Sequence, residues 1–401
     1  MSVDTAGETA RRIMAEFARR TGLDPPSGTP KRYLWTDAFA ACNYLGLSSQ
    51  AGHESCRDLA LRLVDQVHHT LGMHREDDPR KGWISGLPPD EGERHPAIGG
   101  LRIGKRLPER KPGEPPDERL EWDQDGQYFH YLTKWMHALE RVGRATGDPG
   151  YLRWAMELAQ TAHARFTTPA RTGRPGRMYW KMSIDLSRPL VASMGQHDPL
   201  DGFITCCALQ LAAREIPGPS PYPDLRPEIA DFAGICRGID LATDDPLGTG
   251  GLLTDALRIA HIMDHGGAGF LESLGPGLSA WFPVLLGDLM DAAITGLDDF
   301  AGSGNTRLPA EYRLAFRELG LSIGLAGVKD LGRLVKGIAG DSSLEVQAEA
   351  VGQYLPVGDS ITRFWLDERN RQGGSWVEHR EINMVMLATS LAPGGFLGLP
   401  D

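Results

Sequence analysis

Helical periodicity dominates the pattern of hydrophobic and polar positions along this chain. Between 54 and 71, for example, Leu59, Leu63 and Val67 follow one another at four-residue steps, as a helix with one buried face requires. The same reading predicts about thirteen helices, over 8–20, 37–47, 54–71, 126–145, 148–166, 201–215, 227–241, 251–264, 278–297, 309–319, 344–355, 360–370 and 381–391. Strand signals are weak, and only 177–184 is expected to form a short hairpin arm.

The predicted helices fall into two kinds. Five segments are apolar or small on nearly all sides: 37–47, 201–213, 251–263, 281–295 and 382–391. Their partners are amphipathic: 54–71, 148–166, 227–241 and 309–319. A helix that is apolar all round is buried, whereas an amphipathic one lies outside it. The alternation predicts an all-α (α/α) barrel that forms one domain over 1–401.

Two long insertions interrupt the helices, at 74–120 and 168–197. Both are rich in Pro, Gly and charge, and both precede an inner helix, so we expect them at the same end of the barrel. Their cations gather in two stretches, 94–111 and 171–188. Two basic loops at one mouth would focus an anionic ligand. The alternative is that these cations only solvate exposed loops.

The overall charge balance changes which partners can be expected. The chain of 401 residues carries 42 basic and 53 acidic side chains, for a net charge of -11, which opposes nucleic-acid binding. Its five cysteines show no framework spacing, as is usual in a reducing compartment. We find neither a signal-peptide core nor an apolar run long enough for a membrane span. A cytoplasmic enzyme or binding protein is therefore expected, with its oligomeric state left open.

Aromatic and acidic residues recur together where helices begin. The four starts are Trp35-Thr36-Asp37, Trp122-Asp123-Gln124-Asp125, His197-Asp198-Pro199-Leu200-Asp201 and Trp376-Val377-Glu378-His379. An acid at a helix start complements the helix dipole and caps free N–H groups, which is the simpler explanation of any one of them. Four such starts together predict helix ends that converge on one aromatic, acidic pocket.

The paired helices and the long loops before inner helices resemble the six-hairpin glycosidase superfamily, whose fold is an (α/α)6 barrel. Short motifs add to the resemblance, namely Trp122-Asp-Gln-Asp-Gly-Gln-Tyr128 and Trp376-Val-Glu-His-Arg380. That superfamily includes unsaturated glucuronyl hydrolases, N-acylglucosamine and cellobiose 2-epimerases, and several inverting glycoside hydrolases. The resemblance implies a saccharide site in a funnel lined by the N-terminal ends of the inner helices.

Three functions remain open from the sequence. Glycoside hydrolysis needs two carboxylates, and the favoured pair is Asp125 and Asp201, because each opens an inner helix beside a glycine. Sugar epimerisation needs groups that titrate near neutrality, and the resemblance to the epimerases implies the pair His197 and His379. The third alternative is a barrel that binds carbohydrate or protein without catalysis. Hydrolysis of a sugar, which could be anionic, is the leading hypothesis.

Substrate contacts are expected from aromatic rings, which stack on sugar C–H faces, and from polar groups around them. The candidates are Trp35, Asp37, Trp83, Arg102, Trp122, Gln127, Tyr128, Arg177, Trp180, Trp376 and Glu378. No cofactor is expected. A metal site at His261, Asp264 and His265 was weighed, but Gly266-Gly267 follows directly, which favours a last-turn histidine before a glycine cap. No metal is therefore predicted.

Overall fold

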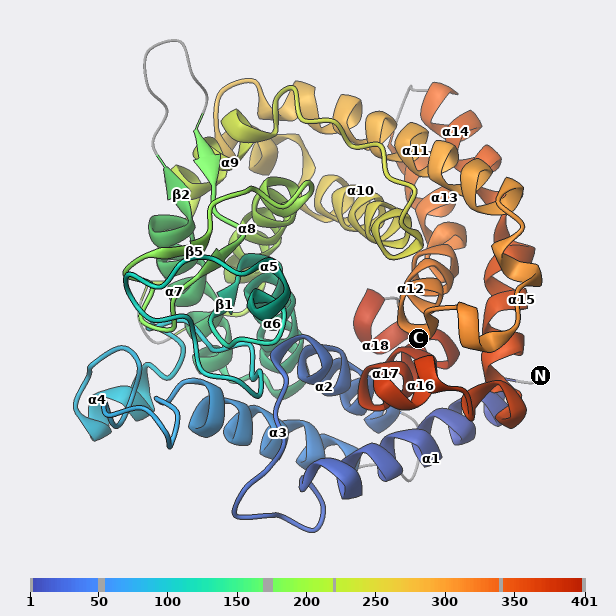
Figure 1. Ribbon diagram of the computed structural model, residues 1–401. Coiled ribbons are helices and arrows are strands. Elements are labelled where there is room, and N and C mark those ends of the chain that lie inside the picture. Colours follow the sequence, from blue (N-terminus) through green and yellow to red (C-terminus); the bar gives the residue numbers. More distant parts are fainter. Residues whose placement is uncertain (1–2, 50–54, 169–175, 219–220, 339–341, 399–401) are drawn as a thin grey trace. The chain divides into compact units, whose positions relative to one another are not determined.

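Helices account for most of the chain in the computed structural model (Figure 1). The structure describes residues 3–49, 55–168, 176–218, 221–338 and 342–398. Strands within these ranges are two or three residues long. The predicted all-α fold class is therefore confirmed.

Contacts between Cα atoms divide the chain into two compact units. The N-terminal unit comprises 18–45 and 54–239, and the C-terminal unit comprises 1–17, 46–53 and 240–401. Helices α1 (Val3–Thr21) and α2 (Leu34–Ser48) each cross a boundary between units. The single domain and the closure of the hairpins into one ring of six stay predictions.

The N-terminal unit consists of helical hairpins with two small sheets. Its further elements are α3 (Ser55–Leu71), α4 (Pro89–Arg94), α5 (Glu118–Glu121), β1 (Gln127–Tyr128), α6 (Phe129–Thr146), α7 (Pro149–Phe166), β2 (Thr167–Thr168), β3 (Arg177–Met178), β4 (Lys181–Met182), β5 (Pro189–Val191), α8 (Asp198–Glu215) and α9 (Arg226–Cys236). Helix α6 packs against α7, and α8 against α9. Gly147, with φ of 71°, ends α6, and the Asp148 carboxylate caps α7 by accepting from the Gly150 N–H at 2.8 Å.

The hairpin arm expected over 177–184 is wrong in its pairing. β3 pairs antiparallel with β2, whereas β4 lies between β1 and β5 in a three-stranded sheet. The two strands of the expected arm therefore belong to different sheets. Short strands take their partners from whichever segment lies beside them, which local alternation does not encode. The pairing of β1 with β4 ties the start of α6 to the second insertion.

The C-terminal unit is helical throughout its described part. Its elements are α10 (Pro246–Leu274), α11 (Leu278–Gly302), η1 (Asn305–Arg307), η2 (Ala310–Tyr312), α12 (Ala315–Ala326), α13 (Val328–Gly337), α14 (Ser342–Gly352), α15 (Leu355–Leu366), η3 (Glu368–Arg371), α16 (Gly374–Glu378), α17 (Arg380–Leu391) and α18 (Gly394–Leu397). Helix α10 continues beyond the end predicted at Asp264, but its backbone leaves the helical region at Gly267, where φ is 65°.

Two helices of this unit exchange the roles that the sequence predicts for them. α12, expected to be amphipathic, is buried almost throughout and packs against α10, α15 and α17. A Cβ added at Gly324 would come within 2.4 Å of the Gly250 carbonyl oxygen, so the two backbones lie in close contact. α11, expected to be buried, exposes one face, on which Val284 is 57% exposed. Because Gly324 and Gly250 have no side chains, α12 can pack closely against α10. This contact helps to bury α12, although the segment predicted for it includes polar residues.

α11 also has the length and apolar composition to cross a bilayer, the one such helix in the described ranges. Its most apolar window is 44% buried, and it packs against α10 and α14. A helix from the core of a globular protein passes the same test of length and composition. The feature is therefore weak evidence for a membrane span.

Candidate functional site

The two insertions pack against each other in the N-terminal unit. The Arg80 guanidinium lies 2.8 Å from the Asp185 carboxylate, and the Ile184 N–H donates to the Glu109 carboxylate at 2.7 Å. Arg110 donates to the Leu190 carbonyl at 2.9 Å. These contacts join the first insertion to the second, as expected for loops at the same end of the helices. Residues 169–175 of the second insertion lie outside the described part.

Several arginines of the first insertion are paired with nearby carboxylates. Arg75 forms an ion pair with Asp77 at 2.7 Å, Arg80 with Asp78 at 2.8 Å, and Arg110 with Glu121. The Arg80 hydrogen bond holds the pKa of Asp78 at about 2. Pairing of this kind cancels much of the field that an anion would feel. Part of the positive charge of the expected anion-focusing mouth is therefore neutralised by the protein itself.

Asp125, a predicted catalytic acid, is surrounded by hydrogen-bond donors. It is fully buried, and Arg102 donates to its carboxylate at 2.7 Å. The N–H groups of Gly104 and Lys105 donate at 3.0 and 3.3 Å, and Arg75 lies at 3.4 Å. Four donors occupy the lone pairs that a carboxylate needs to accept or release a proton. These contacts favour a structural role, and catalysis by Asp125 stays a prediction that they do not support.

Arg102 and Gln127, both predicted to bind substrate, are likewise engaged. Arg102 also donates from Nε to the Met73 carbonyl at 2.8 Å. Gln127 is fully buried; its side-chain oxygen accepts from the Leu101 N–H at 2.8 Å, and its nitrogen donates to the Ile184 carbonyl at 2.7 Å. Both side chains hold the loops together. Their use as substrate ligands stays a prediction.

An aromatic cluster lies where β1 leads into α6. Its members are Tyr33, Trp122, Tyr128, His130, Tyr131 and Trp180. The Trp180 ring centroid is 4.9 Å from that of Tyr128 and 5.0 Å from that of Trp122, and Trp122 is 56% exposed. His130 lies parallel to Trp180 at 6.3 Å, with an interplanar angle of 10°. Three predicted substrate residues, Trp122, Tyr128 and Trp180, are thus brought together.

The hydroxyls of Tyr33 and Tyr131 form one polar edge of this cluster. The two oxygens are 2.7 Å apart, and the Tyr131 ring lies 4.8 Å from that of His130. Burial raises the pKa of Tyr131 well above its usual value. Because Tyr33 precedes α2 and Tyr131 begins α6, this hydroxyl pair joins the starts of two helices.

A buried lysine supports the cluster from β4. Lys181 donates to the Gln124 carbonyl at 2.9 Å and lies 3.3 Å from the Glu121 carboxylate. Its ammonium is 5.5 Å from the Tyr128 ring centroid. Burial lowers the pKa of Lys181, against the opposing effect of Glu121. The lysine therefore fixes α5 to β4 and places a cation beneath the Tyr128 ring.

His130 faces an acid at the start of α8. Its Nδ1 lies 3.5 Å from the Asp198 carboxylate. The His130 side chain is 27% exposed and that of Asp198 only 7%. Neither His130 Nδ1 nor Asp198 Oδ2 has a hydrogen-bond partner among the described residues. A partly exposed imidazole beside a buried, incompletely bonded carboxylate is an arrangement that can accept and return a proton.

A second pair lies one helical turn along the same two helices. The Lys134 ammonium lies 2.8 Å from the Asp201 carboxylate, and the two side chains are 21% and 11% exposed. His130 and Lys134 are four residues apart on α6, while Asp198 and Asp201 are three apart on α8, so each helix presents both groups on one face. Asp201, a predicted catalytic acid, is thus held by a lysine, and its catalytic role stays a prediction.

Two other predicted substrate residues are buried at helix junctions. Trp35 packs on Phe39 with ring centroids 4.6 Å apart, and Trp83 packs over Gly92, where any Cβ would meet the indole. Both tryptophans are at most 8% exposed. Core packing accounts for these environments. Their stacking on a sugar stays a prediction.

Asp37 is a buried acid that holds the start of α2. It accepts from the Tyr33 N–H at 2.8 Å and lies 3.3 Å from Arg32. Burial raises the pKa of Asp37 to about 6 and outweighs the opposing charge of Arg32. This is the capping role that any acid at a helix start can have. A substrate contact by Asp37 stays a prediction.

The remaining predicted residues are two of the N-terminal unit and three of the C-terminal unit. Arg177 is exposed on β3, and the His197 carbonyl accepts the Asp201 N–H at 2.9 Å. In the C-terminal unit, Trp376 stacks on Trp365 at 5.6 Å, the His379 ring lies 5.5 Å from that of Phe316, and Glu378 is exposed. The predicted pairing of His197 with His379 joins two units whose relative placement is not defined, so it stays a prediction.

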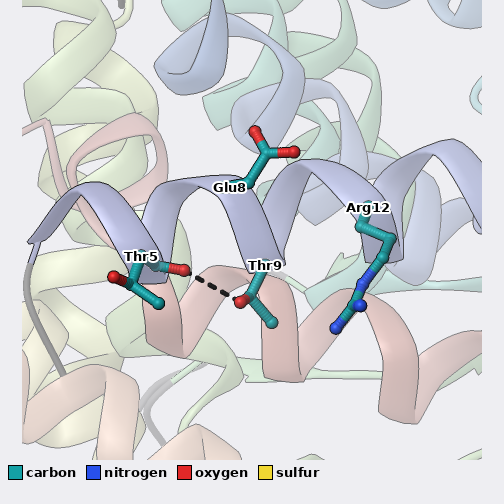
Figure 2. A pocket seen from close by; sticks show the side chains of 4 residues that line it. All are labelled: Thr5, Glu8, Thr9 and Arg12. Carbon is teal, nitrogen blue, oxygen red and sulfur yellow. Dashed lines mark hydrogen bonds between the residues drawn. The ribbon is translucent and has the colours of Figure 1, made fainter.

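Two surface depressions contain none of the predicted residues. One, of about 410 Å³, is lined by Thr5, Glu8, Thr9 and Arg12 on α1 (Figure 2). The other, of about 570 Å³, lies between the end of α8 and the start of α9. In Figure 2 all four lining side chains come from one helix, and Thr9 is bonded to the Thr5 carbonyl at 2.8 Å. Such a shallow helix face lacks the convergent groups of a catalytic site.

Among the described residues, no group of three or more His, Cys, Asp or Glu side chains could hold a metal. His265 lies 3.5 Å from Asp264, with both side chains about half exposed. The His265 ring lies 5.6 Å from that of His261, and these three residues do not form such a group.

Sequence reasoning missed His130, Lys134, Tyr33 and Tyr131. A signal was present: His130 and Lys134 are four apart at the start of a helix, and Asp198 and Asp201 are three apart at the start of another. Spacing of this kind places complementary groups on facing helix surfaces. Recognising it required knowing that α6 packs against α8.

No family model matches the sequence, and no curated protein matches it. The solved structures that are similar to this chain include two sugar epimerases. Cellobiose 2-epimerase from Spirochaeta thermophila has a TM-score of 0.48 and 14% identity, covering 96% of this chain and 98% of that one. A sugar epimerase from a ruminal bacterium has a TM-score of 0.45 and 10% identity, covering 90% and 87%. At these identities, with TM-scores below 0.5, neither likeness states what this chain binds or transforms.

Proposed function

We propose that the protein is a carbohydrate-active enzyme that moves a proton on and off a sugar carbon, as a sugar epimerase or isomerase does. The observation that carries this proposal is the His130–Asp198 pair beside the aromatic cluster. Histidine is the side chain whose ordinary pKa lies closest to neutrality, so it is the usual group for such a transfer.

The geometry of the pair assigns a role to each ring nitrogen. Nδ1 of His130 faces Asp198, so Nε2, on the opposite side of the ring, is the nitrogen left for a substrate. A carboxylate beside Nδ1 orients the ring and stabilises the imidazolium that forms when Nε2 takes a proton. Asp198 is therefore a positioning residue, and His130 is the acid–base group.

The aromatic cluster supplies the binding surface that a sugar needs. Trp180 and Tyr128 both lie next to His130. Tyr128 is only 3% exposed, so the surface is supplied by Trp180 and by Trp122, which is 56% exposed. Indole rings pack against the apolar C–H face of a pyranose while its hydroxyls stay in contact with water. A sugar on this surface would present its carbons within reach of the imidazole.

Hydrolysis, the leading hypothesis from the sequence, finds less support. Its two carboxylates must be available to a glycosidic oxygen and to water. Asp125 has four donors on its carboxylate, and Asp201 is paired with Lys134 at 2.8 Å. An acid held in this way is poorly placed to give up or accept a proton.

The proposed reaction balances without an added redox partner. His130 removes the proton from a carbon beside the sugar carbonyl, and the electron pair moves onto the carbonyl oxygen to give an enediolate. Donation of a proton by water to the opposite face of that carbon gives the epimer, and the imidazolium of His130 then releases its proton to the hydroxide that remains. Return of the proton from His130 to the neighbouring carbon gives the isomer, while the hydroxyl proton moves to the former carbonyl oxygen. Proton transfer by a positioned side chain accelerates such steps by roughly 10²–10⁴-fold.

Deuterium exchange tests the proposal directly. A panel of reducing mono- and disaccharides, incubated with the protein in D₂O, should lose the proton signal of the carbon beside the carbonyl. In His130→Ala we expect the exchange rate to fall by about 10²–10⁴-fold. The method detects proton removal even when little net product accumulates.

His95→Ala is the matched control, because His95 also faces a carboxylate, that of Glu157 at 2.9 Å, in the same unit. Its exchange should equal that of the unchanged protein. Release of reducing ends from glycosides, lost in Asp125→Asn but kept in His130→Ala, would favour hydrolysis instead. Sugar binding without exchange or hydrolysis would indicate a non-catalytic binding protein.

A further inference from the structure

One cation of the first insertion differs from its neighbours. Lys105 is half-buried, and its ammonium lies 5.4 Å from the centroid of the Tyr33 ring. No carboxylate of the described residues forms an ion pair with it, whereas Arg75, Arg80, Arg102 and Arg110 each have one. Other cations of this insertion without an ion pair, such as Arg106 and Lys111, are exposed. A half-buried ammonium without an anion is incompletely compensated.

The backbone of Lys105 is fixed from both sides by the donors and acceptors around Asp125. Its N–H donates to the Asp125 carboxylate at 3.3 Å, and its carbonyl accepts from Arg75 at 2.8 Å. The preceding Gly104 has φ of 91°, and a Cβ there would lie 2.2 Å from the Arg32 carbonyl oxygen. The structural role of Asp125 thus includes holding this turn, and with it the lysine, against the cluster.

Lys105 lies at the polar edge of the aromatic cluster. Tyr33, whose ring it covers, shares a hydroxyl contact with Tyr131, and Tyr131 packs against His130. Three successive contacts therefore lead from the ammonium to the proposed acid–base group. The charge of the buried Lys181 is already paired with Glu121 at 3.3 Å. Burial lowers the pKa of Lys181, and repulsion from Lys105 adds to this effect, so the two ammonium groups interact.

We propose that Lys105 binds an anionic substituent, a carboxylate or a phosphate, on the sugar held at the aromatic cluster. The inference rests on the proposed function and names its substrate class. An ammonium on a flexible stem is a compact point charge that either anion can satisfy. A neutral sugar would leave the ammonium of Lys105 without an anion.

The test uses three sugars that share one ring and differ in charge: glucose, glucuronate and glucose 6-phosphate. Binding to the full-length protein is measured by titration calorimetry at low salt, with Lys105→Met and Lys105→Arg as variants. We expect at least one of the anions to bind about 10-fold more tightly than glucose, which corresponds to a modest net ion pair. Lys105→Met should abolish this preference and leave glucose binding unchanged, while Lys105→Arg should retain it in part.

Lys111→Met is the matched control, because Lys111 is an exposed lysine of the same insertion. It should keep the preference, and raising the salt concentration should weaken the preference in the unchanged protein. Comparing the two anions distinguishes carboxylate from phosphate recognition. Equal binding of all three sugars, or a preference that survives in Lys105→Met, overturns the inference about Lys105 and leaves the proposed function intact. Absence of both sugar binding and proton exchange overturns the two together.

Discussion

Asp125 and Asp198 occupy equivalent places in the sequence and opposite ones in the structure. Each follows a long insertion at the start of a predicted helix, Asp125 three residues after Trp122 and Asp198 directly after His197. Asp125 is fully buried and receives hydrogen bonds from two arginines and two N–H groups. Asp198 is buried beside an imidazole, with one oxygen that lacks a partner among the described residues.

The difference shows that donor count decides what a buried acid can do. A carboxylate with four donors is stabilised as an anion and joins the segments that supply them. A carboxylate with an unused oxygen can respond when its neighbour gains a proton. Substitutions at these and the related acids test this distinction.

The largest expected effect is a loss of stability when Asp125, whose carboxylate has four hydrogen-bond donors, is replaced. Asp125→Ala leaves Arg102 and two backbone N–H groups without their acceptor. Removal of one partner from a buried ion pair costs about 3–5 kcal/mol. Urea unfolding should show a loss of this size. The exposed Asp123 supplies the control, since Asp123→Ala should change the unfolding free energy by less than about 0.5 kcal/mol. A small effect at Asp125 would mean that the loops are held by other contacts.

The next largest effect is expected at Asp37, whose burial raises its pKa more than the charge of Arg32 lowers it. This shift makes the stability of the fold depend on pH. The pKa of Asp37 is about 6 in the fold against 3.8 ordinarily, so between these values the folded state binds more protons than the unfolded state. The contribution of Asp37 to stability is therefore fully present below pH 3.8 and is lost as the pH rises through 6. The difference reaches about 3 kcal/mol.

Asp37→Asn should remove this dependence, as seen in unfolding free energies measured from pH 2 to 7. Asp78→Asn is the opposite control, because Arg80 lowers the pKa of Asp78 to about 2. The stabilisation from Asp78 is present above pH 3.8 and is lost as the pH falls through 2. If the unfolding free energy of the Asp37→Asn variant still decreases between pH 4 and 6, another group causes the pH dependence of stability.

A smaller effect, on activity, is expected at Asp198, whose carboxylate has one oxygen without a hydrogen-bond partner among the described residues. Asp198→Asn keeps the shape of the side chain but removes the charge that orients and stabilises His130. We expect the deuterium exchange rate to fall about 10–100-fold, less than in His130→Ala. Urea unfolding should change by no more than about 1 kcal/mol. Unchanged exchange with a large loss of stability would make Asp198 structural, like Asp125.

The smallest effect is expected at the second pair between α6 and α8. Lys134→Met removes a contact that is partly exposed to solvent, so the cost should be about 1 kcal/mol in unfolding free energy. Exchange should fall no more than several-fold, because the His130–Asp198 contact remains. Exchange lost as completely as in His130→Ala would instead place Lys134 among the groups that act on the substrate.

Much of the fold could be predicted from the sequence, and much less of the site. Helices such as α3 and α7 were expected within one residue of their observed starts, because a period near 3.6 and caps such as Asp148 are local properties of the chain. α13 was missed, and α11 and α12 exchanged roles. Burial of a whole helix depends on what packs against it, as the close contact of Gly324 with Gly250 illustrates.

The sequence alone determined where helices begin, which loops are long, and that aromatic and acidic residues gather at helix starts. Tertiary structure alone decided which of those residues are available for chemistry. Asp125 is saturated by arginines remote in sequence, and His130 obtains its partner from another helix. The physical reason is range: helix formation depends on neighbours within about one turn, whereas the donors around a carboxylate are fixed only when distant segments pack together.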